Sequence, residues 1–503
     1  MTSIVERIAP GGEDAPAILA PERPILTHGG LRRLIADTAA RLNAAGIGRG
    51  DRVAIVLPNG PEMATAFLAI AAASTTAPLN PAYREDEFDF YLGDIDAKAL
   101  VVLAGEDGPA VTVAERRGIA ILRLTPESSG PAGRFALEGP TGGFAVRPGL
   151  AEDGDVALLL HTSGTTSRPK LVPLSHANLA ASADHIGATL ALKPDDRCLN
   201  IMPLFHIHGL IAAVLASLAA GGSTFCTPGF NALRFFAWLA EAQPSWYTAV
   251  PTMHQAILAR AARNPEAVAA AKLRFIRSSS ASLPPQVMAE LEALFGCPVI
   301  ESYGMTEAAH QMASNPLPPA PRKPGSVGIA AGPEVAIMAE DGTLLGPDTV
   351  GEIVIRGCNV TAGYEANPEA NTAAFAHGWF HTGDQGTLDA EGYVRVTGRL
   401  KEIINRGGEK ISPREVDEVI MDHPAVAQVV TFAMPHDKLG EDVAAAVVLR
   451  EGATASESDI RAFCATRLAD FKVPRRIVVL DEIPKGATGK LQRIGLAQKL
   501  GLA

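Results

Sequence analysis

One segment of this chain combines the residue types that hold phosphate groups. Residues 162–170 read TSGTTSRPK and follow a short apolar run, residues 156–160, that suits a buried strand. Gly164 lets the backbone approach a ligand closely, and hydroxyls and backbone N–H groups can donate to phosphate oxygens. Lys170 adds a charge that can neutralise a polyphosphate. We predict a nucleotide-phosphate loop that contains Thr162, Ser163, Gly164, Thr165, Thr166 and Lys170.

This segment differs from the phosphate loop of P-loop kinases and NTPases. Their motif requires GxxxxGK followed by Ser or Thr. Here Gly164 is followed by Pro169, Lys170 and Leu171, so the second glycine and the metal-binding hydroxyl are both missing. A Ser/Thr-rich surface turn would explain such a segment equally well if it stood alone. The prediction therefore depends on motifs elsewhere in the chain.

Further short motifs follow in a fixed order along the chain. Residues 303–307 read YGMTE, residues 381–384 read HTGD, residues 398–402 read GRLKE, residues 406–410 read RGGEK, and residues 484–490 read PKGATGK. Any one of these could be an ordinary turn or a charged surface patch. Because all of them occur in this order, chance is a poor explanation.

Alternating strands and helices must position these motifs. The alternation favours α/β layers with parallel pairing. The pattern becomes β-rich over residues 333–360, which predicts a small barrel-like subdomain there. The first part of the chain contains apolar strand candidates at residues 53–57, 99–103, 157–160 and 275–278 and an alanine-rich helix candidate at residues 62–74.

The pattern changes again after Arg399. A helix at residues 413–422 and strands at residues 426–434 and 442–449 would form a small α+β unit. The predicted fold class is α/β. We expect a large N-terminal domain of layered α/β subdomains with a β-barrel-like subdomain, residues 1–399, and a small, mobile α+β C-terminal domain, residues 400–503.

Length and charge exclude several classes of protein. A chain of 503 residues is too long for one ordinary core, so two or more folding units are expected. Hydrophobic content of 47% and charged content of 20% are typical of a compact globular protein. The net charge of −11 and the lack of a basic run argue against a nucleic-acid partner.

The cysteines and the apolar segments indicate a cytoplasmic protein. The five cysteines are widely spaced, which favours reduced thiols over a disulfide framework. The amino terminus lacks the apolar core of a secretory signal. Residues 210–220 are apolar but short, so we expect a buried helix and no membrane span. The oligomeric state stays open.

Taken together, the motifs resemble those of the adenylate-forming superfamily of acyl-CoA synthetases, luciferases and nonribosomal adenylation domains. The resemblance runs from about residue 25 to residue 490, and within the superfamily it is greatest to oxalate–CoA ligases. Ser167 stands where many members have glycine, a departure that the oxalate-type group also tolerates. The segments that carry this likeness are HTSGTTSRPK, MPLFHIHGL, SYGMTEAAHQMASNPLPP, RKPGSVG and INRGGEKISPREVDEV.

The resemblance implies a reaction in two halves. A carboxylate attacks the α-phosphate of ATP to give an acyl-adenylate and pyrophosphate, and a CoA thiolate then displaces AMP. ATP, Mg²⁺ and CoA are therefore the expected cofactors and co-substrates, and the partner is a small carboxylic acid, with oxalate favoured. Glu307 resembles the family's magnesium-binding carboxylate, Thr306 its phosphate-side hydroxyl, and Lys490 the lysine that binds both reacting oxygens.

The resemblance also assigns nucleotide-binding and hinge residues. Tyr303 would stack on adenine beside Ser302, Asp384 would accept both ribose hydroxyls, and Arg399 would assist from across the site. In this superfamily the small terminal domain rotates between the two half-reactions. Lys401 matches the hinge position, and the loop containing Gly407, Gly408 and Lys410 would help to form the pantetheine tunnel.

Oxalate requires a small pocket with donors for its second carboxylate, because burying an unpaired charge is costly. Our candidates for these donors are His208, Ser280 and His310. A helical turn after Glu307 would place His310 on the same face as that carboxylate. His206 and His208 form an HxH pair, but a zinc site would need further ligands nearby, so we interpret them as pocket residues.

Other functions stay open at this point. Malonate, a short-chain acid and an aryl acid of the cinnamate type are alternative substrates for the same chemistry. A stand-alone enzyme that loads a carrier protein would use another thiol acceptor. A nonenzymatic AMP- or ATP-binding regulator is a third alternative, against which Lys490, Glu307 and the phosphate loop count. No residue specifically supports luciferase activity.

Overall fold

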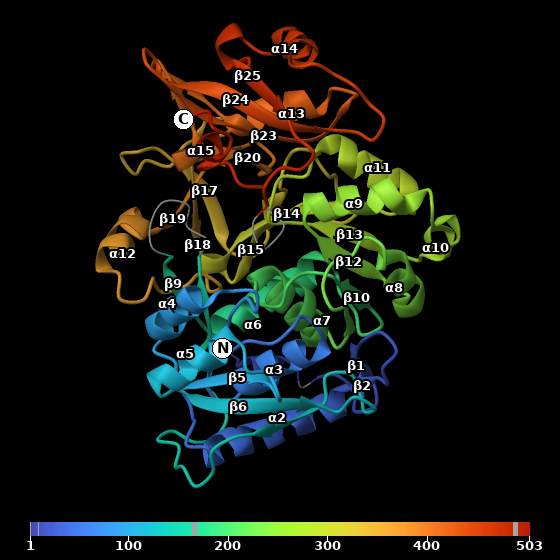
Figure 1. Ribbon diagram of the computed structural model, residues 1–503, viewed down its shortest axis with the longest axis vertical. Coiled ribbons are helices and arrows are strands. Elements are labelled where there is room, and N and C mark those ends of the chain that lie inside the picture. Colours follow the sequence, from blue (N-terminus) through green and yellow to red (C-terminus); the bar gives the residue numbers. More distant parts are fainter. Residues whose placement is uncertain (1, 9, 163–168, 486–490) are drawn as a thin grey trace.

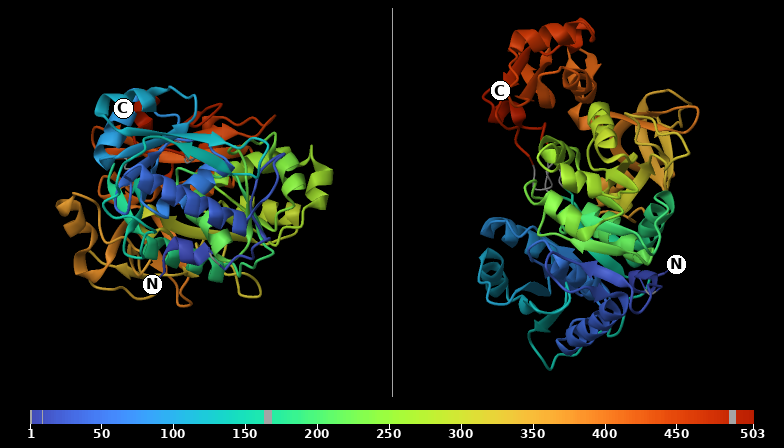
Figure 2. Two further views of the ribbon diagram at one scale, coloured as in Figure 1. Left: turned by 90° about the horizontal axis from the view of Figure 1, so that it is seen from below. Right: turned by 90° about the vertical axis from the view of Figure 1, so that its right-hand side faces the viewer.

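The computed structural model describes residues 2–8, 10–162, 169–485 and 491–503 (Figure 1). The predictions for Ser163, Gly164, Thr165, Thr166 and Lys490 therefore fall outside the described residues. Two large sheets form the lower and middle parts of the molecule, and the C-terminal elements lie at its upper end in Figure 1 and in the right-hand view of Figure 2. Within the described part of the chain, we find no helix with the length and apolarity that a membrane crossing requires.

The first large sheet has seven strands. Its centre is parallel, as the strand–helix alternation predicts, and β7 and β9 close its edges in antiparallel pairing. The predicted strand at residues 99–103 has these bounds in the structure. In spatial order the strands are β7 (Phe135–Glu138), β6 (Ala120–Pro126), β5 (Ala99–Leu103), β3 (Arg52–Ile55), β4 (Thr75–Pro78), β8 (Val156–His161) and β9 (Leu171–Ser175).

The second large sheet has nine strands, and the YGMTE motif begins on its strand β14. The strand predicted at residues 275–278 is confirmed as β13. In spatial order the strands are β16 (Ile329–Ala330), β15 (His310–Ser314), β14 (Val299–Met305), β13 (Phe275–Ser278), β12 (Trp246–Ala249), β10 (Arg197–Asn200), β11 (Ser223–Cys226), β1 (Pro16–Leu19) and β2 (Leu26–Thr27).

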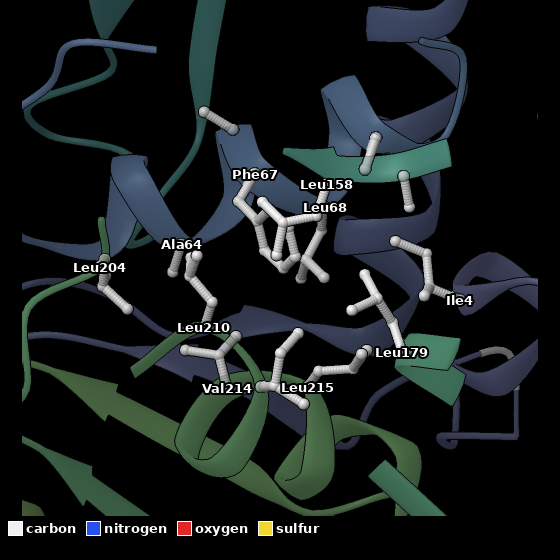
Figure 3. Packing of buried hydrophobic residues seen from close by; sticks show 14 of the residues in the cluster. Ile4, Ala64, Phe67, Leu68, Leu158, Leu179, Leu204, Leu210, Val214 and Leu215 are labelled. Atoms are coloured by element: carbon white, nitrogen blue, oxygen red, sulfur yellow. The ribbon is translucent and has the colours of Figure 1, made fainter. Parts of the chain in front are cut away.

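Helices between the two large sheets form the main core. The alanine-rich segment folds as α3 (Pro61–Ala71), which is buried on every side, as expected of a helix without a polar face. Residues 208–219 form a π-helix, η1 (His208–Leu215), continued by α7 (Ala216–Ala219), so a buried helix there is confirmed. Figure 3 shows Phe67 and Leu68 of α3 against Leu210 and Val214 of η1.

The remaining helices of this part cover the sheets or join their edges. They are α1 (Ile4–Ile8), α2 (His28–Ala44), α4 (Glu85–Ile95), α5 (Pro109–Arg117), α6 (His176–Thr189), α8 (Phe235–Ala242), α9 (Pro251–Ala261), α10 (Pro265–Ala270), α11 (Pro285–Phe295) and α12 (Pro368–Ala374). Short 3₁₀ turns occur at η2 (Thr306–Ala308) and η3 (Ala376–Gly378).

An antiparallel four-stranded sheet forms the region where we expected a barrel-like subdomain. Its buried face packs on Ala313 of β15, so this sheet and the edge of the nine-stranded sheet share a small core. Asp384 of β19 lies directly opposite Arg399 of β20. The strands are β17 (Glu334–Met338), β18 (Gly351–Arg356), β19 (Phe380–Leu388) and β20 (Val394–Arg399).

The C-terminal part is a separate sheet with helices, as predicted. It begins after a 3₁₀ turn, η4 (Leu400–Glu402), and has its own apolar core. The α/β fold class with a small α+β C-terminal unit is therefore confirmed. Its elements are β21 (Ile404–Arg406), β22 (Glu409–Ile411), α13 (Pro413–Met421), β23 (Val426–His436), β24 (Gly440–Leu449), α14 (Glu457–Ala465), η5 (Asp470–Lys472), β25 (Arg476–Val479) and α15 (Leu496–Lys499).

Candidate active site

The two described ends of the phosphate-loop segment are held together. Because β8 and β9 pair in antiparallel fashion, they bring Thr162 and Lys170 to one point. The Thr162 N–H donates to the Lys170 carbonyl at 2.9 Å, and the Lys170 N–H donates to Thr162 Oγ1 at 3.3 Å. The Lys170 ammonium lies 4.3 Å from the centre of the Tyr364 ring, within cation–π distance.

Tyr364 links this lysine to the predicted magnesium carboxylate. Its hydroxyl donates to Glu307 Oε1 at 2.8 Å, and Glu307 is only 6% exposed. Burial raises the pKa of Glu307, while the Tyr364 hydrogen bond and the charges of Arg399 and Lys170 oppose that rise. Thr306 lies beside Glu307 at the start of η2. The chain thus brings Lys170 and Glu307 into one electrostatic group.

A hard-metal site fits this carboxylate. Among the residues that the structure describes, no group of three His, Cys, Asp or Glu side chains forms a ready-made metal cage. Mg²⁺ is commonly held by one or two carboxylates together with substrate phosphates and water. A single buried carboxylate beside the phosphate-loop lysine suits that mode of binding.

Tyr303, Asp384 and Arg399 form a second group. The Tyr303 hydroxyl donates to Asp384 Oδ2, and Arg399 Nε lies 3.1 Å from Asp384 Oδ1. Both contacts follow from the register of β19 and β20, which places Arg399 opposite Asp384. Ser302 precedes Tyr303 on β14 and is buried, and its carbonyl accepts from the Ser279 hydroxyl at 3.0 Å. The predicted adenine and ribose residues are therefore neighbours.

The three predicted acyl-pocket residues also meet. His208 Nδ1 lies 3.0 Å from Ser280 Oγ, and its Nε2 lies 2.6 Å from the hydroxyl of buried Thr248. The His208 and His310 ring centres are 5.0 Å apart. Strands β12, β13 and β14 are parallel neighbours, so their carboxyl ends open at one edge of the sheet. His208 enters from η1, and π-helical turns are frequent at functional sites.

The helical turn expected between Glu307 and His310 is wrong. The 3₁₀ turn η2 ends at Ala308, Ala309 is left-handed, and His310 starts β15 with a φ of 108°. The helix therefore does not continue beyond Ala308, because the residues that follow pair with β14 as strand β15. Gly304 permits this close return, because a Cβ there would lie 1.9 Å from the His310 carbonyl oxygen. His310 reaches the pocket as the first residue of a strand.

Backbone strain is concentrated at this pocket. Ser280 has a φ of 72° and His310 a φ of 108°, both unusual for residues with a side chain. Such conformations persist only where surrounding structure enforces them, and they cluster at functional sites. The strained backbone supports the interpretation of both residues as pocket residues.

The hinge and tunnel candidates lie apart from these groups. Lys401 is exposed within η4, directly after the strand that carries Arg399. Gly407 and Gly408 form the tip of the β21–β22 hairpin with φ values of 59° and 99°, a geometry that favours glycine. The Gly407 N–H donates to the Leu439 carbonyl at 2.9 Å, within the C-terminal sheet, and Lys410 lies on β22.

The sequence analysis missed some residues of the site. Tyr364 joins Lys170 to Glu307, and Arg277 lies beside His310 within a buried strand. Arg277 had a recognisable signal, because a charged residue at an otherwise apolar strand position is unusual. Tyr364 had none, since a tyrosine after a glycine is ordinary in a loop.

Comparisons with known proteins place the chain among AMP-binding enzymes. A model of the AMP-binding enzyme family matches residues 5–365, and a model of the AMP-binding enzyme C-terminal domain matches residues 415–490. An oxalate–CoA ligase of Arabidopsis thaliana is 47% identical over 99% of this chain and 98% of its own length. An oxalate–CoA ligase of Saccharomyces cerevisiae is 41% identical over 90% and 87%.

A solved structure extends the likeness to three dimensions. The crystal structure of ATP-bound MatB from Rhodopseudomonas palustris has a TM-score of 0.88 with this structure at 30% identity, and the match covers 99% of each chain. Both the fold and the order of its parts are thus shared over nearly the full length. The chain belongs to the AMP-binding enzyme family.

Proposed function

We propose that this chain ligates oxalate to CoA through an oxalyl-adenylate, with release of AMP and pyrophosphate. The chain is an AMP-forming acid–thiol ligase, and ATP and CoA are its co-substrates. One observation carries the oxalate assignment. The candidate acyl pocket is a polar cluster in which His208 and His310 are buried and Ser280 is half-buried. A long-chain acid would instead need an apolar channel.

Two anions must react in the first half-reaction, so the enzyme has to neutralise charge before it can orient the reactants. We assign Thr162 and Lys170, with Ser163, Gly164, Thr165 and Thr166, to the outer phosphates. Glu307 would hold Mg²⁺, which would supply positive charge to the phosphate oxygens. Thr306 would donate its hydroxyl to a phosphate. Lys490 would bind the two oxygens between which the new bond forms.

The second group of residues would hold the nucleoside. Tyr303 would pack on adenine next to Ser302, while Asp384 would accept the ribose hydroxyls. Arg399, at 3.1 Å from Asp384, would balance the charge of that carboxylate and orient it. Because Asp384 is 5% exposed, its charge depends on such a partner.

We propose that the unit after residue 400 rotates between the half-reactions. Lys401 would be the hinge, at the point where β20 ends and η4 begins. The rotation would withdraw Lys490 and bring the hairpin of Gly407, Gly408 and Lys410 to the pantetheine arm of CoA. We place the domain boundary between residues 399 and 400. We also propose a cytoplasmic location, which suits the five free cysteines.

In the acyl pocket, His208, Ser280 and His310 would bind the carboxylate of oxalate that does not react. In the tautomer in which His208 Nδ1–H donates to Ser280 Oγ at 3.0 Å, the single Ser280 hydrogen would be left for this carboxylate. The centres of the two imidazole rings lie 5.0 Å apart, so the rings are in contact and would hold the same carboxylate from neighbouring positions.

The test is a comparison of acids with the purified enzyme. AMP, pyrophosphate and CoA-thioester are measured with oxalate, malonate, acetate and cinnamate, each with ATP and Mg²⁺. We expect oxalate to give the highest kcat/KM and one thioester for each AMP. A kcat/KM for acetate or cinnamate above that for oxalate would contradict the substrate assignment. AMP formation that needs a carrier protein in place of CoA would contradict the acceptor.

A further inference from the structure

Arg277 is a buried cation for which the described part of the chain offers no carboxylate within ion-pair distance. It lies on β13, it is 0% exposed, and its Nε and Nη1 atoms have no hydrogen-bond partner among the described residues. Its Nη2 atom lies 3.2 Å from Gln311 Oε1 and 3.5 Å from His310 Nδ1, both uncharged acceptors. Buried guanidinium groups are normally paired, because an isolated charge loses its hydration.

Two partly buried arginines in this chain follow that rule. Arg274, on the approach to the same strand, lies 2.7 Å from Asp196. Arg493 lies 2.6 Å from Asp417 and 3.3 Å from Glu402. Arg277 is therefore an exception that needs an explanation, and its position gives one. It adjoins the pocket in which a carboxylate is expected to bind.

The contact with His310 also has a chemical consequence. A guanidinium has only donors, so the His310 Nδ1 atom that faces it must offer a lone pair. The ring proton then resides on Nε2, and a second positive charge on the ring is disfavoured. Burial lowers the pKa of Arg277 to about 9, so the guanidinium itself stays charged at neutral pH. Gln311 fixes the guanidinium in this position.

We propose that Arg277 is a positioning and specificity-determining residue for acids that carry a second anionic group. It fixes His310 as an Nε2–H donor, and it gives the pocket a positive charge that only a substrate anion neutralises. Acids with two negative charges are thereby favoured over acids with one. This inference rests on the proposed function, which it deepens by naming the source of the selectivity.

The test compares Arg277→Met, which removes the charge at similar length, with Arg277→Lys, which keeps it. Arg274→Met is the matched control, since it removes a paired arginine outside the pocket. We expect Arg277→Met to lower kcat/KM for oxalate by about 100-fold, mainly through KM, because a charged partner is lost. The values for acetate and the KM for ATP should change by less than about threefold, because neither uses this charge. Arg277→Lys should have a kcat/KM for oxalate about tenfold higher than that of Arg277→Met.

A second readout reports on the tautomer directly. In protein labelled with ¹⁵N-histidine, the His310 signals are identified by their loss in His310→Gln. The parent should show an unprotonated Nδ1 and a protonated Nε2. Arg277→Met should lose this preference, and Arg277→Lys should retain it. A parent in which Nδ1 carries the proton would overturn the proposal, even if Arg277→Met fails to fold.

The outcomes separate this inference from the function beneath it. If the parent does not prefer oxalate to acetate, the proposed function itself is wrong. If the parent prefers oxalate and folded Arg277→Met keeps the same ratio, only the role of Arg277 is wrong. A loss of oxalate use in Arg274→Met equal to that in Arg277→Met would also overturn it, because the effect would then be one of stability.

Discussion

The candidate site has two sides, which differ in how their charged groups are paired. The nucleotide side is the part around Asp384 and Glu307, and the acyl side is the part around His310 and Arg277. On the nucleotide side, Asp384 faces Arg399, and Glu307 accepts from Tyr364 near the charge of Lys170. On the acyl side, the guanidinium of Arg277 faces neutral acceptors. In the proposed site, the nucleotide side is thus electrostatically balanced before substrate binds, whereas the acyl side would be balanced only by an anionic substrate. This difference teaches where selectivity for the acid resides.

The largest effect is expected from Lys490→Ala. If Lys490 binds both reacting oxygens, adenylate formation should fall about 10³-fold, as for the loss of a preorganised charge at a reacting group. Thioester formation from supplied oxalyl-adenylate should persist. The two half-reactions are measured separately by pyrophosphate exchange and by thioester release. Lys485→Ala, in the same segment, is the control. An equal fall in both half-reactions would refute the division of roles.

Glu307→Gln should lower kcat by the same factor for every acid, because it alters the nucleotide side of the site. We expect kcat to fall about 100-fold because the phosphate charge is no longer neutralised through this carboxylate. The Mg²⁺ concentration for half-maximal rate should rise, which a titration of initial rates measures. Glu334→Gln changes an exposed carboxylate on β17 and serves as control. If the fall affects oxalate and spares other acids, the two sides are not separable.

His310→Ala should impair the use of oxalate without impairing the binding of ATP. We expect kcat/KM for oxalate to fall about 30-fold, the cost of losing a hydrogen bond to a charged group. The KM for ATP should stay within about twofold, because the nucleotide contacts are unchanged. Steady-state rates at varied oxalate and varied ATP give both values, with His423→Ala in the C-terminal part as control. Unaltered constants for oxalate would remove His310 from the pocket.

Tyr364→Phe should have a smaller effect on the nucleotide side. The ring remains over Lys170, but Glu307 loses a hydrogen bond that lowers its pKa. The pKa of Glu307 should therefore rise further, so the acidic limb of the pH–rate profile moves to higher pH. The rate at neutral pH should fall about tenfold. An acidic limb at the same pH as in the parent would show that this limb does not report Glu307.

Glu301 lies on neither side, and its replacement should alter stability without altering selectivity. Burial raises the pKa of Glu301 from 4.5 to about 7. Between these two pH values the native protein therefore keeps a proton that the unfolded chain has already released. Stability is therefore lost as pH rises from about 4.5 to 7, by roughly 3 kcal/mol. Glu301→Gln should abolish this loss, as urea unfolding at pH 5 and pH 8 will show. A pH dependence equal to that of the parent would contradict the assignment.

The sequence carried much of this arrangement because its signals are local. Apolar runs bounded by turns located β5 and β13, and the resemblance carried by the motifs implied that Tyr303 lies near Asp384 and Lys170 near Glu307. Long-range features could not be read in that way. The return of His310 as a strand depends on pairing between β14 and β15 and on the space at Gly304.

The roles of Arg277 and Tyr364 were also inaccessible to sequence reasoning. The isolation of Arg277 depends on what its neighbours in three dimensions lack, and no local pattern records that. Tyr364 reaches Glu307 across 57 residues of chain. Local propensity therefore predicts the elements, while tertiary packing decides which side chains share a charge.

The proposed reaction passes through an acyl-adenylate, and isotope transfer tests for this intermediate directly. The enzyme is supplied with ATP, Mg²⁺, CoA and oxalate in which every oxygen is ¹⁸O. A reaction through this intermediate gives AMP that contains one ¹⁸O atom, together with unlabelled pyrophosphate and the CoA thioester. Formation of ADP and labelled orthophosphate, with no label in AMP, would contradict it.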